Sequence, residues 1–293
     1  MINKHPIIMI IIGVAGISLS AIFVRYSTAP SAVTAAFRLC WTVLLLSPVV
    51  WGRKEDREEL LGIKKKELLL SIFSGIFLAF HFILWFESLQ HTSVASSTTI
   101  VCTEVIWVAL GYWLFLKGGL SKKEIIAIAI AFLGSAVIAL SDQSSGQGQI
   151  YGDLLSLIAA VAVAVYTLLG RIVRKTVSTN VYTYVVYVSC AIVLLSVCIV
   201  QGHHLFEYGN SAIIVGLLLS IFSTILGHSI FSWCLKYFSP AFVSASKLCE
   251  PVVAAMLAAV LFGEMPKVMQ ILGGIMIIAG VYYYSRIESK EEV

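Results

Sequence analysis

The sequence divides into ten apolar segments separated by short polar connections, and this pattern restricts the chain to one class of fold. Each segment is about 18–23 residues long, close to the length that an α-helix needs to cross a bilayer. None shows the alternation of a membrane β-barrel strand. We therefore predict an all-α integral membrane protein with ten transmembrane helices. The predicted segments are residues 6–24, 32–51, 68–89, 94–116, 124–141, 153–170, 181–200, 212–234, 240–262 and 268–285.

Composition supports a membrane protein. Hydrophobic residues make up 59% of the 293 residues and charged residues only 12%, whereas a soluble domain has about 25% charged residues. The formal net charge is +4 and the basic residues lie in short connections, so no nucleic-acid partner is expected. The six cysteines fall in apolar segments without metal-ligand spacing, so neither a metal nor a cofactor is expected. The first segment has no cleavage site typical of a signal peptide and is interpreted as a span.

The distribution of basic residues predicts the orientation. With the N-terminus in the cytoplasm, the cytoplasmic segments carry sixteen of the 20 Lys and Arg residues, including Lys4 and the cluster between Gly52 and Glu67. The opposite side carries only Arg25 and Lys267. Basic residues are enriched in cytoplasmic loops, so we predict a plasma-membrane protein with both termini in the cytoplasm.

The two halves of the chain contain an internal repeat at a constant shift of 146 residues. Five spans per half is an odd number, so residues 1–145 and 146–293 are predicted to enter the membrane from opposite sides. Inverted repeats of this kind suit alternating access around a site between the halves. The matching pairs are Leu89 and Leu235, Ser93 and Ser239, Ala95 and Ala241, Glu104 and Glu250, and Gly134 and Gly280.

Several motifs resemble the EamA family of the drug/metabolite transporter superfamily. The second half carries Leu235-Lys-Tyr-Phe-Ser-Pro-Ala, Glu250-Pro251 and Leu261-Phe-Gly-Glu264, and the first half carries Ala35-Ala-Phe-Arg38. The resemblance covers nearly the whole chain. It implies a ten-helix secondary transporter with a central cavity, in a family whose members mostly export amino acids and other small metabolites.

The chain also departs from the family pattern. Lys117-Gly118 stands where the first repeat of the family often has Gly-Glu, and Val105 rather than proline follows Glu104. Lys247 is not part of the pattern. We therefore expect the two halves to be functionally unequal.

Lys247 and Glu250 lie in the middle of segment 240–262, beside Pro251, which predicts a local bend. A charge in hydrocarbon costs at least ~2.5–3.5 kcal/mol, so such residues usually face the protein interior and are functional candidates. Because they are three residues apart, they are expected on one helix face. Two interpretations stay open. The residues form an internal ion pair, or one or both contact the substrate or take a proton during transport.

Glu104 lies at the corresponding depth of the fourth segment, and Arg38 lies near the start of the second. A carboxylate removed from water binds a proton more readily, so Glu104 is a candidate for proton coupling. Equally, it could be a structural partner of Arg38. For Arg38 a structural role is favoured over contact with the substrate.

Two histidines and several aromatic residues complete the candidates. His81 and His228 occupy corresponding regions of the third and eighth segments, either as packing residues or as a pair that binds substrate or relays protons. Trp85 and Tyr166 could stack on an aromatic or cationic ligand, although aromatic residues in spans more often pack or anchor at the interface. The same argument covers Trp107, Trp233 and Phe80.

The predicted function is secondary transport of a small metabolite, with export of an amino acid or related compound as the first interpretation. Import or exchange of a small organic cation is the alternative. A channel is disfavoured by the duplicated halves. An intramembrane enzyme is a distant alternative, because the three aspartates lie in or beside loops and no Gly-x-Ser-x-Gly or His-Glu-x-x-His motif occurs. The sequence leaves the substrate, the coupling ion, the direction of transport and the oligomeric state open.

Overall fold

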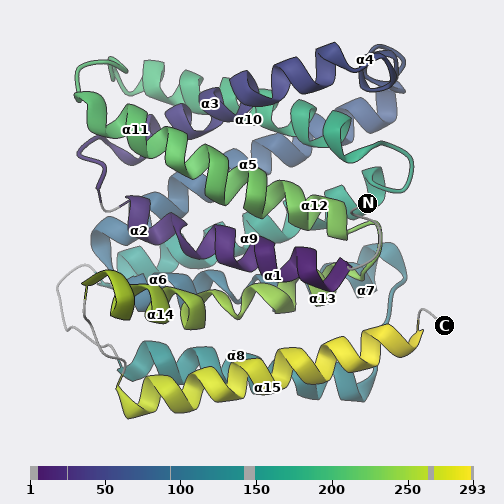
Figure 1. Ribbon diagram of the computed structural model, residues 1–293, viewed down its shortest axis with the longest axis vertical. Helices are drawn as coiled ribbons and strands as arrows, with labels where there is room; N and C mark the ends of the chain where they lie inside the picture. The colour runs from purple at the N-terminus through teal and green to yellow at the C-terminus, as the bar shows by residue number, and fades with distance from the viewer. Residues whose placement is uncertain (1–5, 25, 93, 142–148, 263–266, 292–293) are drawn as a thin grey trace.

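The computed structural model describes residues 6–24, 26–92, 94–141, 149–262 and 267–291, and every regular element in these ranges is helical (Figure 1). The first half of the chain forms α1 (Pro6–Ser18), α2 (Ser20–Val24), α3 (Ser31–Gly52), α4 (Lys54–Leu61), α5 (Lys65–His91), α6 (Val94–Val101), α7 (Glu104–Leu116) and α8 (Lys122–Ser141). The second half forms α9 (Gln149–Val173), α10 (Thr179–Val200), α11 (Asn210–Leu218), the π-helix η1 (Leu219–Ser229), α12 (Ile230–Cys234), α13 (Pro240–Lys247), α14 (Glu250–Phe262) and α15 (Val268–Glu291).

Within the described residues, eight helical stretches are long and apolar enough to cross a membrane, so the chain is a multi-pass α-helical membrane protein. The other two predicted segments correspond to α8 and to α13 with α14. Lys4, the predicted boundary at residues 145 and 146, and the Gly263-Glu264 part of the motif lie outside the described residues. The eight stretches are Pro6–Val24, Ser31–Gly52, Lys65–His91, Ser96–Leu116, Ile150–Val173, Thr179–Val200, Asn210–Cys234 and Val268–Ile287.

Two of the predicted segments are broken by a two-residue interruption. Segment 94–116 is divided between α6 and α7, and segment 240–262 between α13 and α14. At the second break the N–H of Cys249 donates to the carbonyl of Ser246 at 3.2 Å, three residues back rather than four. Pro251 has no N–H with which to continue the α-helical ladder there. The bend expected at Pro251 is thus a break that begins just before it.

The first break needs a different cause, because no proline follows Glu104. Val105 supplies an N–H, and it donates to the carbonyl of Cys102 at 3.4 Å, again three residues back. The N–H of Thr103 likewise donates to the carbonyl of Ile100 at 3.0 Å. Both breaks are therefore tight turns that separate the helix dipoles on either side.

The helices lie side by side and pack along one another (Figure 1). Helix α5 packs along both α9 and α10, and α3 packs along α10 and α11. In the same way α1 packs along η1, and α8 packs along α15. The Pro6 end of α1 and the Glu291 end of α15 lie at the same end of the bundle in Figure 1.

The connection between α3 and α5 contains a helix that was predicted only as a polar loop. Helix α4 is docked onto the start of α10, where the side-chain amide of Asn180 donates to Asp56 Oδ2 at 2.8 Å. The backbone N–H of Ser178 donates to Glu59 Oε1 at 2.7 Å. The acidic residues of α4 thus bind the positive end of α10, which is a favourable arrangement.

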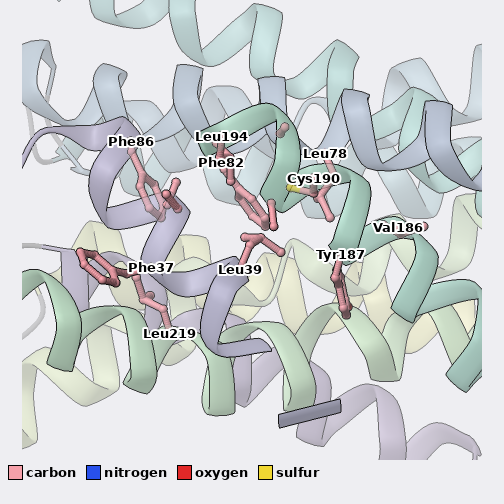
Figure 2. Close-up of a cluster of buried hydrophobic side chains, with 14 of the residues drawn as sticks. Phe37, Leu39, Leu78, Phe82, Phe86, Val186, Tyr187, Cys190, Leu194 and Leu219 are labelled. Atoms are coloured by element: carbon pink, nitrogen blue, oxygen red, sulfur yellow. The ribbon is translucent and has the colours of Figure 1, made fainter. Parts of the chain in front are cut away.

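The buried apolar side chains form two clusters. The first joins α3, α5, α10 and η1, and Figure 2 shows Phe37, Phe82, Tyr187 and Leu219 among its members. The second joins α1, α8, α13 and α15. Several charged and polar side chains are buried beside these clusters, among them Arg38, His81, Glu104, His228 and Lys247.

Candidate functional site

An ion pair joins the two helix breaks. Lys247 Nζ donates to Glu104 Oε1 at 2.8 Å, and the two side chains are only 9% and 5% exposed. Lys247 is the last residue of α13 and Glu104 is the first residue of α7. A cation at the C-terminal end of one helix and a carboxylate at the N-terminal end of another both interact favourably with the helix dipoles.

This pairing corrects two expectations. Lys247 and Glu250 do not share one helix face, because the break places them at the ends of different helices. Glu104 is not paired with Arg38 either. The partner of Glu104 lies in the other half of the chain. Helical periodicity does not predict a contact between residues so far apart in sequence.

An aromatic ring also lies close to the Lys247 ammonium. The ring centroid of Phe231, in α12, is 5.3 Å from Nζ, within the range of a cation–π interaction. Phe231 is itself buried. Sequence reasoning missed this residue, because nothing in an apolar helix distinguishes one phenylalanine from the others.

Glu250 differs from Glu104 in both exposure and contacts. Its side chain is partly exposed, and among the described residues its carboxylate forms no hydrogen bond or ion pair. It interacts electrostatically with Lys247, Glu104 and Arg38. Its backbone carbonyl accepts a hydrogen bond from Ser18 Oγ in α1 at 3.4 Å. Glu250 is therefore the one carboxylate of this region that is available to a ligand within the described chain.

Arg38 is held by structural contacts. Its Nε donates to Thr224 Oγ1 at 2.7 Å and its Nη1 donates to Ser20 Oγ at 3.4 Å. The guanidinium carbon lies 4.0 Å from the centroid of the Phe82 ring. Arg38 thus ties α3 to η1, to α2 and to α5. Thr224 and Ser20 were not among the predicted residues.

The two histidines lie against each other, with ring centroids 6.3 Å apart. His81 Nδ1 is 3.1 Å from the carbonyl of Ala159 and its ring stacks on Trp85 at 6.1 Å. His228 lies in the π-helix η1 and contacts the Tyr166 ring at 6.0 Å. Short π-helical segments occur frequently at functional sites.

Some buried polar atoms of this region have no hydrogen-bond partner within the described chain. They are Trp85 Nε1, His228 Nδ1, Arg38 Nη2 and the hydroxyl of Ser244. Buried polar groups are normally satisfied. Such atoms are candidates for hydrogen bonds to water or to a ligand.

The remaining aromatic candidates have separate surroundings. Tyr166 is buried and its hydroxyl shares a 2.8 Å hydrogen bond with Ser232 Oγ. Trp107 Nε1 has no partner within the described chain. Trp233 packs on Tyr237 with centroids 4.4 Å apart. Phe80 is 48% exposed on the surface of α5.

The EamA-like transporter family matches the sequence twice, over residues 5–140 and 150–286. The chain belongs to the EamA-like transporter family. Its members are transporters, so the protein is a transporter and not an enzyme.

Relatives of this EamA-like transporter carry transporter names. An "Uncharacterized transporter YxxF" of Bacillus subtilis is 27% identical, covering 74% of this chain and 70% of the relative. A "Probable amino-acid metabolite efflux pump" of Salmonella typhimurium is 29% identical, covering 60% of this chain and 61% of the relative. A solved crystal structure with 14% identity covers 99% of both chains at a TM-score of 0.79, which shows a shared fold.

The EamA-like transporter therefore places two carboxylates and one ammonium at helix breaks, and one histidine, His228, in a π-helix, where it lies against His81 of α5. Glu104 and Lys247 neutralise each other, whereas the Glu250 carboxylate and the polar atoms named above have no hydrogen-bond partner within the described chain. Among the described residues, no group of three or more His, Cys, Asp or Glu side chains is arranged to hold a metal ion.

Proposed function

We propose that the protein is a secondary transporter that exports an amino acid or a related small metabolite across the plasma membrane by alternating access. The observation that carries the proposal is the 2.8 Å ion pair between Glu104 and Lys247, which links the two family-matched halves. Rocking of the halves would make and break contacts at this position. A carrier needs such a junction near its substrate site.

The proposed architecture is ten spans in two inverted repeats, residues 1–145 and 146–293, with both termini in the cytoplasm. Glu104 and Glu250, which are related by the repeat shift, each begin a helix after a two-residue break. The packing of α5 along α9 is matched by that of η1 along α1, as an exchange of the two halves requires. The start of α1 and the end of α15 lie at the same end of the bundle, which supports an even number of crossings.

The proposed substrate site lies between these halves. The carboxylates of this region would bind the ammonium group of the substrate. Trp85 Nε1 and His228 Nδ1, which have no hydrogen-bond partner within the described chain, would contact its other polar atoms. The export direction and the amino-acid class are supported by the name of the Salmonella typhimurium relative. Import or exchange of an organic cation is the second candidate, favoured by the carboxylate and aromatic ring around Lys247.

The test is a thermal-shift screen of the twenty amino acids and of small organic cations on purified protein, followed by efflux from liposomes. The proposal expects saturable efflux of at least one amino acid that also stabilises the protein. Efflux of organic cations alone would support the second candidate. Flux that rises linearly with concentration, or none for either class, would contradict a carrier of these substrates.

A further inference from the structure

Glu104 and Phe231 together form a binding position for a primary ammonium. A buried carboxylate gives a charge-assisted hydrogen bond, and an aromatic face attracts a cation. Lys247 Nζ meets both, at 2.8 Å from Glu104 Oε1 and 5.3 Å from the Phe231 centroid. The position is thus filled by an ammonium that belongs to the protein itself.

Lys247 is held there by few contacts. An ammonium has three donors, and within the described chain one hydrogen bond, to Glu104, accounts for the polar contacts of Nζ. The side chain has a flexible four-carbon stem and begins at the C-terminal end of α13, beside a helix break. It can therefore withdraw from Glu104 without disturbing a longer helix.

The neighbouring cation Arg38 does not replace Lys247 as the partner of Glu104. Arg38 is committed to Thr224, Ser20 and the Phe82 ring. If Lys247 left and nothing replaced it, Glu104 would be a buried carboxylate without a partner, which is strongly unfavourable. Another cation, or a proton taken up by Glu104 itself, can compensate for the loss of Lys247 at a lower cost.

We propose that, when the transporter is empty, the Lys247 side chain occupies the position that the ammonium group of the substrate takes when it is bound. The substrate ammonium displaces Lys247 from Glu104 and Phe231, and Lys247 returns when the substrate leaves. This inference rests on the proposed transport function. In consequence the carrier remains neutralised when it is empty, so it can reorient without substrate and supports net efflux as well as exchange.

The first test separates net efflux from exchange for the amino acid that the wild-type protein transports in liposomes. Lys247→Met removes the competitor, so the half-saturation concentration should fall about tenfold, as expected when a competing state is removed. At a pH at which Glu104 stays ionised, the empty carrier then holds an uncompensated carboxylate, so net efflux should fall about tenfold while exchange is retained. Lys236→Met, at an exposed lysine in the same region, is the control and should change neither.

Lys247→Arg provides a second variant in case Lys247→Met does not fold. A guanidinium can bind a carboxylate through two parallel hydrogen bonds, so it should compete better than lysine and raise the half-saturation concentration. Loss of both exchange and net efflux in a folded Lys247→Met protein would overturn the proposal, because Lys247 would then contact the substrate itself. Unchanged kinetics in both variants would overturn it as well.

A binding test does not depend on transport. Ethylammonium chloride, compared with sodium chloride, should raise the Tm of Lys247→Ala, and should not do so for the Lys247→Ala/Glu104→Gln double variant or for the wild type. No rise for Lys247→Ala would overturn the ammonium position even if transport were established. A rise without any amino-acid flux would support the position and contradict the proposed function instead.

Discussion

Glu104 and Glu250 are each the first residue of a helix that resumes after a two-residue break, yet only Glu104 has an ion-pair partner within the described chain. The two carboxylates are related by the 146-residue shift, so the repeat supplies the same backbone geometry twice. Lys247 makes the halves unequal, because the first half has Val101 at the corresponding position. One carboxylate is thereby neutralised by Lys247, and the other has no counter-ion within the described chain.

This asymmetry predicts opposite effects of two matched substitutions. Glu104→Gln leaves the buried Lys247 ammonium without its counter-ion and should destabilise the protein by about 3–5 kcal/mol. Glu250→Gln changes a partly exposed group without a partner in the described chain and should alter stability by less than about 1 kcal/mol. Thermal unfolding in one detergent measures both, with Glu58→Gln on the exposed face of α4 as the control.

Relative to its small effect on stability, Glu250→Gln should reduce transport more than Glu104→Gln does. Glu250→Gln should reduce amino-acid efflux or change its dependence on pH, while the protein remains folded. Equal efflux at every pH would remove Glu250 from the mechanism.

Arg38 is predicted to be structural. Arg38→Lys keeps the charge but cannot reach Thr224 and Ser20 together or stack a planar group on Phe82. We expect a loss of about 1–3 kcal/mol in the free energy of unfolding, with an unchanged half-saturation concentration. A raised half-saturation concentration at unchanged Tm would show instead that Arg38 binds the substrate.

The two histidines should respond differently to the same change. His81→Leu removes the contact between Nδ1 and the Ala159 carbonyl and should cost about 1 kcal/mol of stability. His228→Leu removes a buried nitrogen without a partner in the described chain, so stability should not fall, but efflux should. Parallel Tm and liposome measurements decide this. Full efflux in the His228→Leu protein would exclude His228 from substrate contact.

The contact between α8 and α15 depends on glycine. A Cβ atom added at Gly273 would lie 2.6 Å from the carbonyl oxygen of Gly134, whereas one at Gly274 would meet nothing closer than Val252 at 3.6 Å. Gly273→Ala should therefore destabilise the protein by about 1–3 kcal/mol. Gly274→Ala is the adjacent control and should have little effect. Equal Tm values for the two variants would contradict this packing.

Sequence reasoning located the membrane helices because each is a long apolar run with polar ends, and it located Glu104, Lys247 and Arg38 because charges are rare in such runs. It did not predict the partner of Lys247, since α7 and α13 are brought together only by tertiary packing. No proline follows Glu104, so the sequence does not predict the break before it. The π-helix around His228 and the helix α4 also depend on contacts with other helices, which periodicity does not record.

The most direct test of the central claim is counterflow in liposomes, with the amino acid that stabilises the purified protein. Unlabelled amino acid is loaded inside, and uptake of the labelled compound is followed against its gradient. Alternating access predicts transient accumulation of label above the external concentration, and the same curve at reduced height for Glu250→Gln. Label that only equilibrates with the outside, with no transient excess, would contradict a carrier and the site proposed between its halves.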